Sequence, residues 1–412
     1  MKLYGPFKQI VTLEQLPLRG AIDDSKLVIH EDSGVLVHEG IIKAVGSYEA
    51  LKEEAEEFEE FEGDYVLFPG FVDCHTHICF AGNRANDFAM RNAGKSYLDI
   101  AAAGGGIWSS VEHTRAATEE VLLDSLLERI DYMVRLGITT IEIKSGYGLS
   151  ERQELKMLRV IQKAQEKTSA TLVPTCLAAH MKPKDFEEDP SQGRTYLNYV
   201  LQEVLTEVKE ENLARRVDIF IEKSAFQPEE SQIFLEKAKI LGFDLTVHAD
   251  QFTPGSSRVA VDAGARSADH LEVTAGSDLK YLAESDTVAV ALPGASIGLG
   301  EPFAPARELL DHGAILAIGS DWNPGSAPMG NLITQASILA TYQKLSTAEV
   351  LSGITYRAAH ALNFEDRGRV SEGMKADFVV YSTDNYQNLL YKQGALVPDQ
   401  VFINGEKYNG RV

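Results

Sequence analysis

The chain has 412 residues and a formal net charge of −22, from 61 Asp and Glu against 39 Lys and Arg. This excess of acid, without any block of basic residues, argues against a partner that is a nucleic acid or an anionic membrane, and it favours a small-molecule substrate. The sequence has no apolar run long enough to span a bilayer, no signal-peptide core near its start and only three cysteines, so we expect a cytoplasmic protein without a disulfide framework.

The two ends of the chain have β-character. Residues 1–66 read as short strands and turns, with one helix-like segment at 47–63 whose acidic run, 53–62, we expect to be a solvated helix face. Residues 369–412 return to strand character in ADFVVYS and QVFINGE. Neither end is long enough to bury a core alone, so we expect them to join in one small composite β-sandwich domain.

Between the two ends, residues 67–368 alternate short apolar runs with segments of helical spacing, which is the pattern of βα units. Helices are predicted over 121–134, 153–167 and 229–241. The predicted strands are 70–78, 139–144, 171–178, 217–222, 244–249, 267–270, 287–292 and 314–320. Eight strands that alternate with helices predict an α/β fold, a (β/α)₈ TIM barrel.

Histidine and aspartate fall at the carboxyl ends of these predicted strands. His75 and His77 close the first strand two residues apart, so both side chains leave the same face. His248, His270 and Asp321 each end a later strand. In a closed barrel these ends converge on one mouth, where active sites lie. Three imidazoles and a carboxylate suit Zn²⁺, and another first-row ion such as iron fits the same donors.

Several assignments stay open at this level. His270 is either a ligand, a neighbour of the ligands or a catalytic base. Lys144 ends the second strand, where a carbamylated lysine bridging two metals is an alternative, but with Asp321 as a ligand we expect one metal. Cys74 has the opposite parity to its histidine neighbours and is expected to point into the barrel wall. The segment Gly104–Gly106 is either the hinge of a flap or a simple turn.

Five motifs carry a family resemblance: FPGFVDCHTH (68–77), SGYG (145–148), HADQF (248–252), SDWNPGS (320–326) and GMKADFVV (373–380). Together they resemble the amidohydrolase superfamily, and within it the imidazolonepropionase family, over essentially the whole chain. The resemblance implies a metal-dependent hydrolase that opens the cyclic amide of imidazolonepropionate to N-formimidoylglutamate in histidine degradation. It also implies zinc or iron as the cofactor and a homodimer.

The resemblance assigns residues one by one. It implies that His75, His77, His248 and Asp321 are the metal ligands. The positions matching those that hold substrate or product are Arg84, Tyr97, Tyr147, His180, Gln251, Asn323, Gly325 and Ser326. Related sequences carry Glu or Gln at the position of Gln251, and an amide cannot act as a general base.

The chemistry of these residue types is consistent with that assignment. A metal-activated water would attack the ring carbonyl, and Asp321 or His270 would carry its proton to the leaving nitrogen. His270 or His180 would donate to the oxyanion. Arg84, on the first βα loop, suits the propionate because a guanidinium binds a carboxylate with two parallel hydrogen bonds.

Two other functions remain as alternatives. A deaminase of a purine or pyrimidine ring would share the metal site but would not need Arg84. A catalytically inactive barrel that serves as a binding protein would have lost ligands, and all of the predicted ligands are present.

Overall fold

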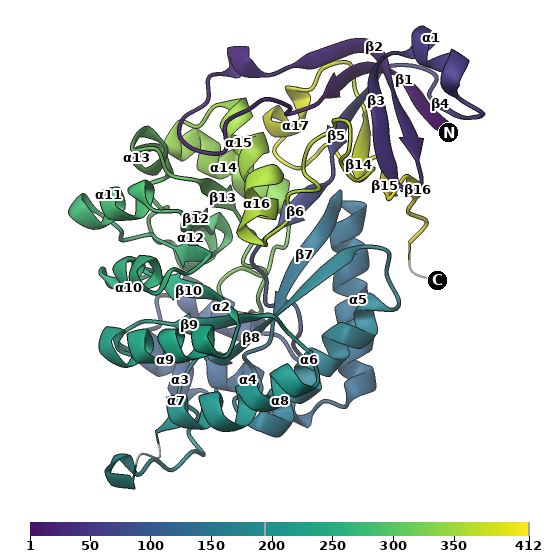
Figure 1. Ribbon diagram of the computed structural model, residues 1–412. Helices are drawn as coiled ribbons and strands as arrows, with labels where there is room; N and C mark the ends of the chain where they lie inside the picture. The colour runs from purple at the N-terminus through teal and green to yellow at the C-terminus, as the bar shows by residue number, and fades with distance from the viewer. Residues whose placement is uncertain (193–194, 411–412) are drawn as a thin grey trace.

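Two eight-stranded sheets organise the chain (Figure 1). The computed structural model describes residues 1–192 and 195–410, and their side chains except those of Tyr97, Leu98, Ala101 and Gln192. One sheet is the wall of a barrel surrounded by helices, and the other lies above it and is built from both ends of the chain. Among the described residues, no helix is both long and apolar enough to cross a membrane.

The barrel strands pair side by side in chain order, and every pairing is parallel. They are β6 (Phe71–Asp73), β7 (Ile138–Lys144), β8 (Thr171–Ala179), β9 (Arg216–Phe220), β10 (Asp244–Ala249), β11 (Ser267–His270), β12 (Val288–Ala291) and β13 (Leu316–Ile318). Each corresponds to one of the eight predicted strands, so the (β/α)₈ prediction is confirmed.

The barrel closes just beyond its first and last strands. The N–H of Asp321 donates to the carbonyl of His75 at 3.0 Å, and the N–H of His77 donates to the carbonyl of Trp322 at 2.9 Å. The first strand is shorter than the predicted 70–78, because the carboxylate of Asp73 accepts backbone N–H groups of Ser320 and His75 and interrupts the ladder. The two histidines therefore lie in the segment that follows β6.

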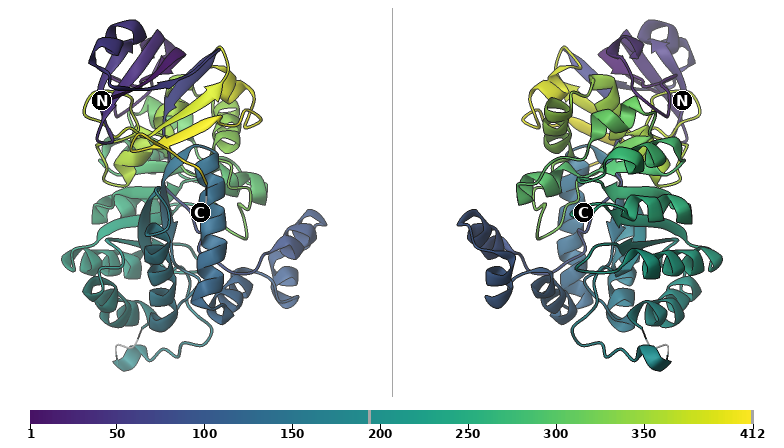
Figure 2. Two further views of the ribbon diagram at one scale, coloured as in Figure 1. Left: turned by 90° about the vertical axis from the view of Figure 1, so that its right-hand side faces the viewer. Right: turned by 90° about the vertical axis from the view of Figure 1, so that its left-hand side faces the viewer.

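Helices cover the outside of the barrel. The three predicted helices appear as α5 (Glu119–Arg135), α6 (Glu151–Gln165) and α9 (Pro228–Ile240). The others are α2 (Ala85–Asn92), α3 (Tyr97–Ala102), α4 (Ile107–Ala116), α7 (Tyr196–Tyr199), α8 (Leu205–Glu210), α10 (Ser256–Ala263), α11 (Gly276–Glu284), α12 (Pro293–Leu299), α13 (Ala306–Asp311), α14 (Leu332–Gln343), α15 (Thr347–Gly353) and α16 (Tyr356–Ala361). In both views of Figure 2 the blue helices that follow β6 extend away from the barrel body.

The second sheet confirms the expected composite domain. Its strands are β1 (Lys2–Val11), β2 (Ile29–His38), β3 (Ile41–Ser47), β4 (Glu57–Glu60), β5 (Tyr65–Pro69), β14 (Phe378–Ser382), β15 (Gln400–Ile403) and β16 (Glu406–Lys407). The antiparallel pairing of β5 with β14 joins the two ends of the chain, and aromatic rings of Phe7, Phe61, Phe378 and Phe402 contribute to a separate core. Since β5 belongs to this sheet, the chain enters the barrel at Gly70, slightly after the expected boundary at 67.

The acidic segment 47–63 differs from its prediction. Only α1 (Tyr48–Leu51) and a short 3₁₀ turn (Lys52–Glu54) are helical, and the chain then forms β4. β4 runs parallel to the start of β1, where Lys2 pairs with Glu59 at 2.9 Å. The prediction of one continuous helix was wrong because an unpaired sheet edge offered the backbone a hydrogen-bonding partner that the local sequence does not reveal.

Candidate metal centre and active-site cavity

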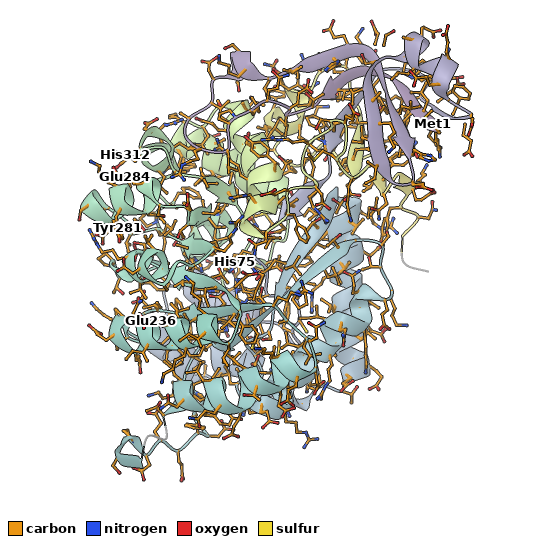
Figure 3. The ribbon with its side chains drawn as sticks, in the orientation of Figure 1. Met1, His75, Glu236, Tyr281, Glu284 and His312 are labelled. Carbon is orange, nitrogen blue, oxygen red and sulfur yellow. The ribbon has the colours of Figure 1, made fainter. Side chains whose placement is uncertain are left out.

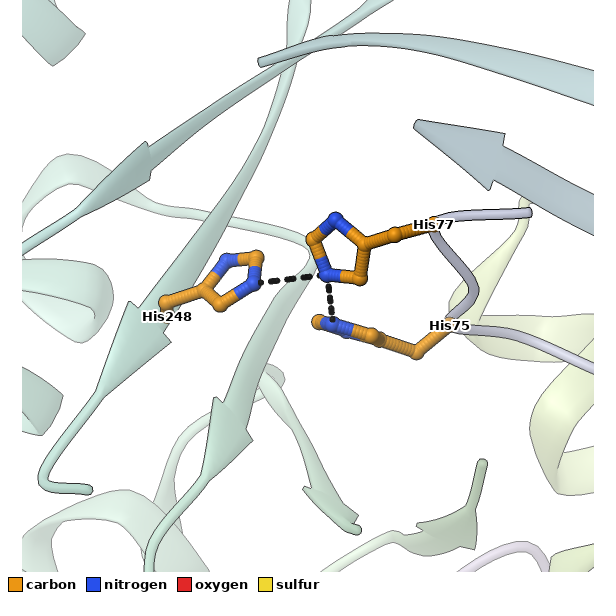
Figure 4. Close-up of side chains that lie close together, drawn as sticks. All are labelled: His75, His77 and His248. Carbon is orange, nitrogen blue, oxygen red and sulfur yellow. Dashed lines mark hydrogen bonds between the residues drawn. The ribbon is translucent and has the colours of Figure 1, made fainter. Parts of the chain in front are cut away.

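Three histidines meet at the carboxyl ends of the barrel strands (Figure 4). His75 and His77 follow β6, and His248 lies in β10 on the other side of the mouth. The Nε2 atom of His77 lies 3.2 Å from Nε2 of His75 and 3.2 Å from Nε2 of His248. Figure 3 shows the position of His75 within the barrel.

Buried carboxylates hold the far side of two of these rings. Nδ1 of His75 lies 2.7 Å from Oδ2 of Asp269, and Nδ1 of His248 lies 2.9 Å from Oδ2 of Asp218. Each Nδ1 therefore carries the ring hydrogen, and each Nε2 presents a lone pair. A single hydrogen on Nε2 of His77 satisfies only one of its two contacts. The remaining pair of facing lone pairs calls for a cation between the rings.

Asp321 completes a four-atom donor set. Its Oδ1 lies 3.6 Å from Nε2 of His75 and 3.4 Å from Nε2 of His77. Bonds of about 2.0–2.2 Å to a tetrahedral ion place neighbouring donor atoms about 3.3–3.6 Å apart. The measured separations between these donors, 3.2 to 3.6 Å, match this geometry and fit one metal ion.

The charges of the site follow from burial. Burial lowers the pKa of His77 to about 4 even though Asp321 opposes this shift. Burial, together with the charge of Lys144, lowers the pKa of His75 well below its usual range. Both imidazoles are therefore neutral near pH 7 and available as ligands.

Lys144 lies beneath the donors as a buried cation. Its Nζ lies 2.8 Å from Oε1 of Glu142 and 2.8 Å from Oδ2 of Asp218, and 3.9 Å from Oδ2 of Asp269. Burial alone would lower the pKa of Lys144, but Asp218 and Glu142 raise it. A permanently charged ammonium does not fit a carbamylated lysine, and the arrangement agrees with the expectation of a single metal.

A cavity of about 590 Å³ opens above the donor set. The predicted site residues that line it are His77, Arg84, Tyr147, His180, His248, Gln251, His270, Asp321, Asn323, Gly325 and Ser326. His75 is fully buried below the cavity, and the side chain of Tyr97 lies outside those that the structure describes. Residues spread over much of the chain are thus gathered in one place.

Comparisons with known proteins agree with this geometry. The model of the amidohydrolase family matches residues 66–407. An imidazolonepropionase of Clostridium tetani is 36% identical over 96% of this chain and 95% of its own length, and one of Acinetobacter baumannii is 40% identical over 92% and 94%. The chain belongs to the amidohydrolase family, among the imidazolonepropionases.

Solved structures share the fold at low identity. Atrazine chlorohydrolase from Arthrobacter aurescens, complexed with zinc, superposes with a TM-score of 0.67 at 17% identity, over 99% of this chain and 95% of that one. Guanine deaminase from C. acetobutylicum superposes with a TM-score of 0.70 at 14% identity, over 98% and 99%. These similarities place the composite domain and the barrel of this amidohydrolase in one shared architecture.

The loop after β13 is organised around one amide in this amidohydrolase. Nδ2 of Asn323 donates to the carbonyl of Asp321 at 2.7 Å and to its Oδ2 at 3.0 Å. Oδ1 of Asn323 accepts the N–H groups of Gly325 and Ser326 at 2.7 and 2.8 Å. Asn323 therefore orients Asp321, and Gly325 leaves room for the guanidinium of Arg84, which a Cβ at this position would overlap.

The SGYG turn forms another wall of the cavity. The carboxylate of Glu154, on α6, accepts the N–H groups of Gly146 at 3.0 Å, Gly148 at 2.8 Å and Leu149 at 2.6 Å. The carbonyl of Gly146 in turn lies 3.0 Å from Nδ1 of His180. Nδ1 of His180 thus carries the hydrogen and Nε2 is an acceptor, whereas burial holds its pKa well below the usual range. This tautomer suits a hydrogen-bond acceptor rather than the oxyanion donor that the sequence also allowed.

His270 is also held by a carboxylate. Its Nδ1 lies 3.3 Å from Oε1 of Glu272, and its ring shares a possible ligand group with His75 and Asp321. Burial alone would lower the pKa of His270, but Glu272 raises it. The φ of His270 is +85°, a left-handed conformation that costs energy for a non-glycine residue and is typical of functional sites.

Sequence reasoning missed the carboxylates behind the histidines and the turn. Asp218, Asp269, Glu142 and Glu154 are all fully or almost fully buried. Three of them stand in otherwise apolar barrel strands. A charged residue inside a buried strand is expensive unless it is paired, and this was the available indication. Their partners, however, lie on other strands and could not be read from the sequence.

Proposed function

We propose that this chain is a metal-dependent imidazolonepropionase, which hydrolyses the ring amide of imidazolonepropionate to N-formimidoylglutamate in histidine degradation. The observation that carries the proposal is a four-donor metal site and an arginine side chain in the same cavity. Relatives that bear this name match nearly the whole chain at 36% to 40% identity, which supports it.

The metal ligands are proposed to be His75, His77, His248 and Asp321. When bound there, a divalent ion supplies Lewis-acid chemistry, which makes water acidic enough to act as a nucleophile near neutral pH. We propose zinc, which is present in solved relatives of the same fold, and iron remains the competing ion for these donors.

The substrate is proposed to be held at both of its ends. Arg84 binds the propionate carboxylate, and Nε2 of His180 accepts a ring N–H. The remaining proposed contacts to substrate or product are Tyr97, Tyr147, Gln251, Asn323, Gly325 and Ser326. Asn323 also keeps Asp321 in place, so the loop after β13 links substrate binding to the reacting centre.

Asp321 and His270 are proposed to move the proton. Oδ1 of Asp321 faces the ligand nitrogens, whereas its Oδ2 is held by Asn323, so Oδ1 is the atom placed to accept the proton of the attacking water. His270, held at Nδ1 by Glu272, presents Nε2 as the second carrier toward the leaving ring nitrogen. Gln251 has no part in this transfer because an amide is not a base.

The test is an ultraviolet assay of imidazolone loss with purified protein. We expect activity that is lost on chelation and restored by added zinc or iron. Intact protein carrying its metal that leaves imidazolonepropionate unchanged would refute the proposal. The same protein should not deaminate guanine or adenosine, and turnover of either would favour the alternative of a ring deaminase.

Cellular location and assembly complete the proposal. Cys74, Cys79 and Cys176 are buried and unpaired, which suits the reducing cytoplasm. We propose a homodimer with no nucleic acid or membrane partner, and the molar mass measured by light scattering tests the dimer.

A further inference from the structure

A buried carboxylate that none of the assignments above includes lies behind Arg84. Asp87 is in the first turn of α2 and is 4% exposed. Its Oδ2 accepts Nε–H of Arg84 at 2.7 Å and the backbone N–H of Gly106 at 2.8 Å. One oxygen atom therefore joins the proposed substrate arginine to the start of α4.

The carboxylate of Asp87 has little freedom to rotate. A Cβ at Gly105 would overlap its Oδ1, so the backbone of the Gly104–Gly106 segment packs directly against it. This contact, together with the hydrogen bond from Gly106, encloses Asp87 from the side opposite Arg84. The triple-glycine segment thus has a packing reason at Gly105, whatever its motion.

The contact with Asp87 also determines which donors of Arg84 remain available. An arginine has five N–H donors in a planar fork, and here Nε is already occupied. The terminal amino groups lie at the cavity, with Nη1 packed against Gly325. Two parallel N–H groups at the end of the fork match the two oxygens of a carboxylate.

We infer that Asp87 is a positioning residue that aims the guanidinium of Arg84 at the carboxylate of the substrate, an inference that rests on the proposed function. Its charge and its geometry have opposite consequences. As a charge beside Arg84, Asp87 weakens attraction for an anion, so its removal would tighten binding. As a hydrogen-bond acceptor it orients Arg84, so its removal would weaken binding.

Two substitutions separate the charge from the geometry. Asp87→Asn removes the charge but keeps an oxygen that accepts from Arg84, whereas Asp87→Ala removes both. We expect Asp87→Ala to raise KM for imidazolonepropionate roughly tenfold with little change in kcat, the size expected for one misaligned charge-assisted hydrogen bond. Asp87→Asn should stay within roughly threefold of wild type, because the acceptor oxygen remains.

A double-mutant cycle shows whether the effect passes through Arg84. In an Arg84→Gln background, Asp87→Ala should cause no further rise in KM. The matched control is Asp99→Asn on α3, an exposed carboxylate bonded only within its own turn to Ser96, which should leave KM unchanged. Thermal melting and metal content of each variant confirm that it is folded and loaded.

Three outcomes would overturn this inference alone while the wild-type enzyme turns over imidazolonepropionate. They are an unchanged KM in Asp87→Ala, a lower KM in both Asp87 variants, and a rise in KM that persists when Arg84 is already Gln. Folded, metal-loaded wild-type protein without turnover would instead refute the proposed function, and this inference would fall with it.

Discussion

The carboxylate behind His75 offers a sharp test of the metal centre. Asp269 lies on β11 and is almost fully buried, and its Oδ2 accepts from Nδ1 of His75 at 2.7 Å and from the hydroxyl of Thr246 at 3.0 Å. Asp269→Asn keeps the shape and an acceptor oxygen but removes the negative charge. We expect a folded protein whose metal binds more weakly, because a carboxylate makes the opposite ring nitrogen a stronger ligand.

The size of the effect follows from the hydrogen bond. A bond to an ionised group contributes about 1.5–3 kcal/mol and a neutral one about 0.5–1.5 kcal/mol, so the substitution costs about 1–1.5 kcal/mol. Since 1.4 kcal/mol is a factor of ten, the dissociation constant of the metal should rise roughly tenfold, at the low end of the range of about 10- to 100-fold for such partners.

The assay is a chelator competition at fixed pH, which measures the zinc dissociation constants of wild type and variant. Glu349→Gln is the matched control, since Glu349 is an equally buried carboxylate bonded to Ile22, Ser346 and Arg307, none of which lines the cavity. The control should lose thermal stability without any change in zinc affinity. Equal zinc affinities in Asp269→Asn and wild type would refute the reasoning that Asp269 tunes His75.

Three further predictions concern the cavity and the thiols. Arg84→Ala should raise KM for imidazolonepropionate by roughly 10- to 150-fold, since a charge-assisted bond is lost, with unchanged metal content; an unaltered KM would remove Arg84 from the carboxylate site. Glu154→Gln replaces an acceptor with a donor facing backbone N–H groups, so KM should rise and the melting temperature should fall, and a variant identical to wild type in both would contradict the role given to this turn. Burial raises the pKa of the Cys79 and Cys176 thiols to about 12, so the native protein should resist thiol reagents near neutral pH while the denatured chain reacts, and fast labelling of native protein would contradict this. Because these folded values exceed the ordinary value of 9.0, the contribution of both thiols to stability is complete below that pH and is lost as the pH rises toward about 12, which denaturant titrations at several pH values would detect.

Much of the barrel could be predicted because its strands are short apolar runs separated by helices with one apolar face. The prediction failed where pairing decided the structure. Glu57–Glu60 has the composition of a solvated helix, yet it adds to the edge of β1, and the first barrel strand ends at Asp73 because that carboxylate captures neighbouring N–H groups. Both features depend on partners distant in sequence, which local periodicity does not contain.

The sequence by itself determined the donors: the HxH pair, the later histidines and Asp321 are visible because parallel strands of a barrel end at one mouth. Only the tertiary structure decided how those donors are prepared. It placed Asp269 and Asp218 against ring nitrogens, buried Lys144 between carboxylates, and set Asp87 behind Arg84. The physical reason is that hydrogen-bond geometry and burial, which set tautomers and charge, arise between strands and loops rather than along the chain.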